Sequence, residues 1–132
     1  MKQDLPTHWV MDYETLLNCF VGVFQHYKDD SISEIFIITK DQNDLPKFID
    51  FLKKCVQLNQ WHISYNGLAF DAQISQHILK NEAKLLKLSG LEVAMYIHKL
   101  AQSIIDNDLF SNSLAWGVNI DGFTLDSLSN KI

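Results

Sequence analysis

The stretch His8-Trp9-Val10-Met11-Asp12-Tyr13-Glu14 decides the fold, because it is a strand-like apolar run that ends in two carboxylates. A longer aromatic and β-branched run follows at residues 17–27, and a polar turn at residues 28–31 separates it from a third apolar run at residues 34–39. Three strands joined by such short connections predict an antiparallel meander.

Helical periodicity then replaces the strand pattern. Asp44 is a candidate N-cap with Pro46 in the first turn, and an apolar face follows at Phe48, Phe51, Leu52, Cys55 and Val56. Residues 61–65 predict a fourth strand, and Asn66-Gly67 predicts a turn after it.

The last part of the chain is mostly helical in pattern. Residues 70–88 predict a long helix, with a break at Asn81 left open and Gly90 as its stop. Residues 91–105 predict another helix, whose apolar face would be partly exposed if a C-terminal part were missing and could then support self-association. Residues 107–113 are a polar loop, and residues 118–121 are a candidate fifth strand.

This order predicts one α/β domain spanning residues 1–132, with a mixed sheet of a three-strand antiparallel meander plus parallel strands, flanked by helices. That layout resembles the ribonuclease-H-like fold. No apolar run approaches the roughly 20 residues that a membrane span needs. The two cysteines, Cys19 and Cys55, are expected to be buried free thiols, which favours a cytoplasmic location.

The charge balance limits how the chain could bind nucleic acid. The formal net charge is −5, and all 11 basic residues are lysine. This argues against a protein that binds nucleic acid by phosphate neutralisation alone. It does not argue against a nuclease, because acids that hold metal ions are part of the negative count.

Three carboxylates are the candidate site. Asp12 and Glu14 alternate along one strand and therefore point to the same side, where they repel each other unless a cation neutralises them. Asp71 would reach the same pocket if the fourth strand pairs beside the first. Converging carboxylates suit a two-metal site, in which the ions lie roughly 3.5–4 Å apart.

These residues carry a family resemblance. The chain resembles the proofreading 3′–5′ exonuclease domain of family B, phage-type DNA polymerases, within the DEDD superfamily. The first motif of that family is matched by Asp12, Glu14, Thr15 and Leu16, and its second motif by Asn66, Phe70 and Asp71. The match covers residues 8–80 well and the rest loosely.

The resemblance implies a function and its cofactors. Asp12, Glu14 and Asp71 would be catalytic and would bind two Mg²⁺ or Mn²⁺ ions. Substrate-binding roles fall on Thr15 and Leu16 at the terminal nucleotide and on Asn66 and Phe70 along the strand. The substrate would be the 3′ end of single-stranded DNA, and the partner a polymerase domain or another replication protein. The location would be the cytoplasm, that of the host if the chain is phage-encoded.

One departure from the family is serious. Its third motif, Tyr-x-x-x-Asp or His-x-x-x-x-Asp, is absent after Asp71, because Leu100 follows Tyr96 and Ser103 follows His98 at the required offsets. We therefore expect a domain that lacks its C-terminal part, with Asp121 and Asp126 as candidate substitutes.

Other interpretations stay open. The chain could be a catalytically incomplete fragment that binds nucleic acid or protein, or a ribonuclease-H-like nuclease acting on RNA. Taken singly, Asp12 and Glu14 could be solvated residues, Asp71 a helix cap and Phe70 a core residue. The five histidines show no metal-ligand spacing, and His77 and His98 are expected at solvent or edge positions on their helices.

Overall fold

The computed structural model describes residues 7–64 and 70–106. They form a four-stranded sheet in the order β3-β2-β1-β4, made of β1 (Trp9–Leu16), β2 (Cys19–His26), β3 (Ser33–Ile38) and β4 (His62–Ser64). The first three strands are antiparallel neighbours, whereas β4 pairs in parallel with β1. The predicted meander and the placement of the fourth strand beside the first are confirmed.

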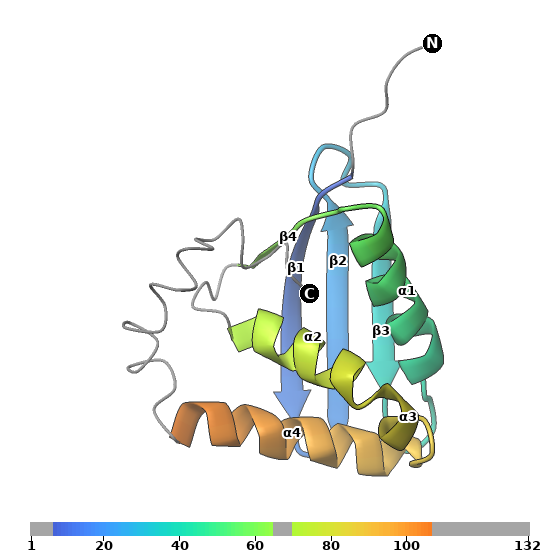
Figure 1. The fold of residues 1–132 in the computed structure, drawn as a ribbon, viewed down its shortest axis with the longest axis vertical. Helices are drawn as coiled ribbons and strands as arrows, with labels where there is room; N and C mark the ends of the chain where they lie inside the picture. The colour runs from blue at the N-terminus through green and yellow to red at the C-terminus, as the bar shows by residue number, and fades with distance from the viewer. Residues whose placement is uncertain (1–6, 65–69, 107–132) are drawn as a thin grey trace.

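Four helices complete the described part: α1 (Leu45–Gln57), α2 (Phe70–Lys80), α3 (Glu82–Leu85) and α4 (Gly90–Asp106). In Figure 1, α1, α2 and α4 all lie in front of the sheet, and α4 crosses near the ends of β1 and β3. The fold is thus α/β with a mixed sheet flanked by helices. The candidate fifth strand at residues 118–121 and the loop at residues 107–113 lie outside the described residues.

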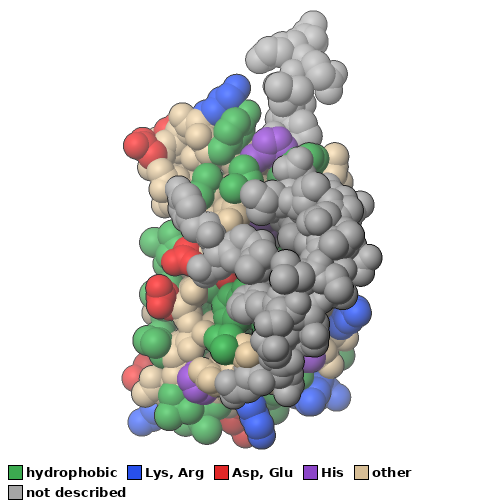
Figure 2. All heavy atoms as spheres, turned by 90° about the vertical axis from the view of Figure 1, so that its left-hand side faces the viewer, with side chains coloured by type: hydrophobic (Ala, Val, Ile, Leu, Met, Phe, Trp, Pro, Cys, Tyr) green, Lys and Arg blue, Asp and Glu red, His purple; other side chains and the backbone are tan. Residues whose placement is uncertain are grey.

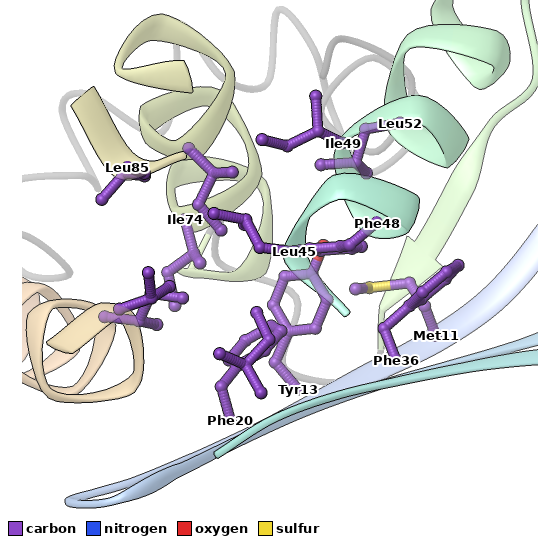
Figure 3. Packing of buried hydrophobic residues seen from close by; sticks show 14 of the residues in the cluster. Met11, Tyr13, Phe20, Phe36, Leu45, Phe48, Ile49, Leu52, Ile74 and Leu85 are labelled. Atoms are coloured by element: carbon purple, nitrogen blue, oxygen red, sulfur yellow. The ribbon is translucent and has the colours of Figure 1, made fainter. Parts of the chain in front are cut away.

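The core fills the space between the sheet and the helices. Phe20 and Tyr13 rise from the sheet toward Leu45 and Phe48 on α1 (Figure 3), and the ring centroids of Tyr13 and Phe48 are 5.8 Å apart. Aromatic rings of this size bury much apolar area and prefer the tilted and edge-to-face contacts seen here. Ile74 and Leu85 extend the same core across α2 and α3.

Two residues, Asn81 and Gly90, mark the helix boundaries after β4. The break at Asn81 is confirmed, since α2 ends at Lys80 and the Asn81 side chain donates to the carbonyl of His77. Gly90 as a helix stop is wrong, because Gly90 begins α4. Ser89 and Glu92 form a capping box there, with the Ser89 N–H donating to Glu92 and the Glu92 N–H donating to Ser89 Oγ.

The reason for glycine at this position is packing. A Cβ on Gly90 would lie 2.0 Å from the carbonyl oxygen of Thr39, so any side chain would force the start of α4 away from the end of β3. The glycine therefore allows two segments far apart in sequence to approach closely.

Asp44 occupies the N-cap position of α1, as predicted, but its side chain makes no capping hydrogen bond. Its carboxylate instead accepts hydrogen bonds from the backbone of Ile37 and the side chain of Gln42. The predicted Pro46 in the first turn is confirmed. The apolar face of α1 is also as expected except at Val56, which is exposed.

The apolar face of α4 packs into the core. Val93, Ala94, Ile97, Ala101 and Ile104 are buried, whereas Ile105 is exposed. Both cysteines are free thiols, as predicted. Cys55 is buried in the core, whereas Cys19 is only half-buried, because it lies at the start of β2 beside the hairpin turn. None of the helices in residues 7–64 and 70–106 has the length and hydropathy to cross a membrane.

Candidate functional site

The candidate site lies at the edge of the sheet where β4 ends. β4 pairs only with Trp9, Val10 and Met11, so β1 continues from Asp12 onward without a strand partner on that side among the described residues. α2 starts soon after β4 and brings Asp71 into this gap. The short fourth strand thus leaves the position beside Asp12 unpaired in the described part of the chain, and Asp71 lies within electrostatic reach of it.

Asp71 is the most strongly buried acid in the described part of the chain, with 2% of its surface exposed. Ser64, the last residue of β4, donates its hydroxyl to Asp71 Oδ2 at 2.5 Å. The other carboxylate oxygen, Oδ1, is buried and has no hydrogen-bond partner among the described residues. A buried acceptor without a donor is costly, which makes this oxygen a candidate ligand atom.

The charge environment of Asp71 agrees with this interpretation. Its pKa is raised to about 6, chiefly because burial disfavours the charged form and also because Asp12 places a second negative charge nearby, while the hydrogen bond from Ser64 opposes the shift. Asp12 and Asp71 therefore lie within electrostatic reach of each other. Two carboxylate groups in such a position favour a cation between them.

Asp12 and Glu14 lie on the face of the sheet that points away from the helices. Both are exposed, as the alternation along β1 predicted, and they stand opposite Val23 and Val21 of β2. Figure 2 shows the molecule from the side of β4 and β1, where acidic side chains lie at the surface beside exposed hydrophobic ones.

The described residues bring together two of the three predicted acids. Asp12 acts on Asp71, whereas Glu14 continues along the same face of β1. Within residues 7–64 and 70–106, no group of three or more His, Cys, Asp or Glu side chains is placed to hold a metal ion. The three-acid metal site therefore stays a prediction.

The other predicted residues differ in their surroundings. Thr15 and Leu16 are the last two residues of β1, and Leu16 projects an exposed side chain at the tip of the hairpin. Phe70 is only 9% exposed and belongs to the core, so little of its ring is open to a base. Asn66 lies outside the described residues.

Some contacts around the site could not be found from the sequence pattern. The Tyr13 hydroxyl and Ser75 Oγ form a buried hydrogen bond of 2.5 Å directly behind the acids. His98 Nδ1 lies 3.0 Å from the carbonyl of Thr15, so this histidine joins α4 to the end of β1 rather than pointing into solvent. The position of Tyr13 between the two acids marks it as a core residue, but no sequence signal points to its partner Ser75.

Comparisons with known proteins identify no relative of this chain. No family model matches the chain, and neither a curated protein nor a solved structure matches it. The geometry of the described residues therefore carries the functional argument.

Proposed function

We propose that this chain is a metal-dependent 3′–5′ exonuclease domain of the polymerase proofreading type, built on a ribonuclease-H-like fold. The observation that carries the proposal is the buried Asp71 carboxylate, whose Oδ1 has no partner among the described residues and whose pKa is raised by burial and by Asp12. The strand order β3-β2-β1-β4, with β4 parallel to β1, supports the fold assignment.

The residues fit a divalent cation by their chemistry. Carboxylate oxygens are the ligands that Mg²⁺ and Mn²⁺ prefer, and a cation at Asp12 and Asp71 would satisfy the orphaned Oδ1 and offset the repulsion between the two acids. We assign Asp12, Glu14 and Asp71 as the residues that would hold the metal. Bound ions would supply an activated water and stabilise the leaving 3′ oxygen.

The chain itself would position the DNA end. Ser64 fixes the Asp71 carboxylate through its hydroxyl, and Asp12 and Glu14 are held on a strand paired along its whole length with β2. The exposed side chain of Leu16, at the end of the same strand, would pack against the terminal nucleotide. Thr15 would contact the same nucleotide, and Asn66 would order the strand behind it. The largely buried Phe70 would contribute by packing at the start of α2 rather than by stacking on a base.

One observation favours a second candidate. Because no set of three metal-ligating side chains is assembled among the described residues, the chain could be a catalytically incomplete exonuclease-fold module. Such a module would bind nucleic acid or a replication protein without cutting. The two candidates differ in whether cleavage depends on Asp12 and Asp71.

A nuclease assay separates them. The full chain is incubated with a 5′-labelled single-stranded oligonucleotide and Mg²⁺ or Mn²⁺, beside Asp12→Asn and Asp71→Asn, so that a ladder of shortened products reveals 3′–5′ removal. Asp50→Asn is the matched control, because Asp50 is exposed on α1. We expect cleavage by the native chain and by the control, and a loss of about a hundredfold or more in the site variants.

The opposite results are equally clear. Cleavage that persists in both site variants would show that these acids do not carry the reaction. Absence of cleavage in every sample, with binding of the oligonucleotide retained, would support the incomplete module. Cleavage of RNA but not DNA, still dependent on Asp12, would reassign the substrate.

A further inference from the structure

A histidine and a lysine contact the Tyr96 side chain on α4. His77 Nε2 is 2.6 Å from the Tyr96 hydroxyl, and their ring centroids are 5.5 Å apart. Lys84 Nζ lies 5.0 Å from the centroid of the same ring, a cation–π distance. We call His77, Lys80, Lys84 and Tyr96 the α2–α4 cluster.

The charges of this cluster are close to one another. Burial lowers the pKa of His77, and the positive charges of Lys84 and Lys80 lower it further, so both ammonium groups are within electrostatic reach of the imidazole. The imidazole is therefore neutral at neutral pH, and the positive charge of the cluster comes from Lys80 and Lys84.

No opposite charge joins them in the described part of the chain. The ion pair there links Lys53 to Glu82 at 2.6 Å, and no described carboxylate pairs with Lys80 or Lys84. This is notable in a chain of net charge −5, where acids outnumber lysines 16 to 11. Among residues 7–64 and 70–106, the two lysines of the cluster thus have no ion-pair partner, and a hydroxyl and an imidazole lie beside them.

We propose that the α2–α4 cluster binds a phosphate group of a single-stranded nucleic acid. The proposal rests on the proposed function, since it concerns the strand whose end would lie at Asp71. Ammonium and imidazole N–H groups are strong donors to phosphate oxygens, and Tyr96 adds a hydroxyl. In a chain with no arginine and a surplus of acids, a positive site of this kind would attract a polyanion toward the carboxylates.

The position of the cluster agrees with this role. Asp71 and His77 belong to the same helix, six residues or about 9 Å apart along its axis. A strand with its end at Asp71 can therefore place a nearby phosphate over the last turns of α2.

Binding to a fluorescein-labelled oligothymidylate tests the proposal. Anisotropy is measured with the full chain in EDTA, which prevents metal-dependent cleavage, over a series of salt concentrations. The variant Lys80→Gln/Lys84→Gln is compared with Lys40→Gln/Lys47→Gln, which removes two exposed lysines elsewhere on the surface. Far-UV circular dichroism and urea unfolding confirm that both variants fold.

We expect the cluster variant to bind about tenfold more weakly and to lower the slope of log K against log salt concentration by about 0.7, the value for one neutralised phosphate on a single strand. The control should change both quantities much less. Equal losses in the two variants would overturn the proposal, because they would indicate general attraction rather than a site. Absence of binding by the native chain would overturn it as well, and so would displacement by a polyglutamate peptide as effective as unlabelled oligothymidylate.

The experiments distinguish rejection of the phosphate site from rejection of the proposed nuclease function. Cleavage that depends on Asp12 and has the same KM in the cluster variant would reject the phosphate site and leave the nuclease standing. Binding that depends on Lys80 and Lys84, without any cleavage in Mg²⁺ or Mn²⁺, would support the phosphate site and reject the nuclease.

Discussion

One face of β1 packs against the helices, whereas the other face, in the described part of the chain, remains accessible. Trp9, Met11 and Tyr13 point into the core, and Asp12 and Glu14 alternate with them on the accessible side. The same eight-residue strand thus supplies core packing on one face and carboxylates on the other. Substitutions on the two faces should therefore separate stability from chemistry.

The accessible face is nevertheless not a polar one. Val23, Ile35 and Ile63 are 37%, 55% and 38% exposed, and they share this face with the acids. Strands that are apolar on both sides are typical of sheets covered on both sides. The two faces of this sheet therefore differ less in composition than in what packs on them among the described residues.

The largest loss of stability should come from a substitution in the core, where the helices pack on the sheet. Phe48 is fully buried, and its ring contacts those of Tyr13, Phe20, Phe24 and Phe36. Phe48→Ala should lower the free energy of unfolding by about 3–5 kcal/mol, because it removes a large ring and leaves a cavity. Urea unfolding measures the loss.

Val23→Thr on the accessible face is the matched control for that experiment. Its expected cost is about 0.5 kcal/mol or less, as for other surface substitutions. Equal destabilisation by the two variants would contradict the difference between the faces and show that the accessible face is buried in the folded chain.

Replacement of Asp71 should give the next largest change in the free energy of unfolding. This change should be a gain in stability rather than a loss. Its pKa is about 6 in the folded chain, above the ordinary value of 3.8 for an aspartic acid, so the folded state prefers the neutral acid. The stability that this group contributes is fully present below about pH 4 and is lost as the pH rises through about 6, a change of at most about 3 kcal/mol. Without divalent cations, Asp71→Asn should therefore be more stable than the native chain above pH 6 and lose this part of the pH dependence.

Urea unfolding at several pH values, with the native chain and Asp71→Asn side by side, measures this difference. Added Mg²⁺ should stabilise the native chain at neutral pH and leave the variant nearly unchanged, because ligand binding to the folded state adds to its stability. A native chain that is no less stable than the variant above pH 6 would show that the Asp71 carboxylate is better satisfied than its surroundings indicate.

The local sequence pattern predicts most of the sheet, but it does not predict the tertiary contacts of the candidate site. The strands and the break at Asn81 follow from composition and periodicity, which depend on neighbouring residues in sequence. The prediction of Gly90 as a helix stop is wrong because the reason for this glycine is the carbonyl of Thr39, far earlier in the chain. The carboxylates can be found from their motifs, but the burial of Asp71 depends on tertiary packing that no local pattern records.

His62 shows the same limit of prediction from local sequence. The neighbours of His62 predict a strand, yet nothing local indicates that its ring is buried against Phe51, with both nitrogens lacking partners among the described residues. Burial lowers the pKa of His62 to about 3, so the ring is neutral at ordinary pH. Which side of a short strand faces the core is decided by the register with β1, and the sequence alone leaves that register open.

The smallest effect should come from the hydrogen bond that lies behind the acids. Tyr13→Phe removes the hydroxyl that contacts Ser75 Oγ and leaves the buried serine without this partner, which should cost about 1–2 kcal/mol in urea unfolding. Adding Ser75→Ala should recover most of that loss, because a buried pair replaced by apolar groups of similar shape is nearly neutral. If the double variant is instead as unstable as the sum of the two single variants, the two hydroxyls are not coupled. The covered face of β1 would then be stabilised by apolar packing alone, and the contrast with its carboxylate-bearing face would be sharper.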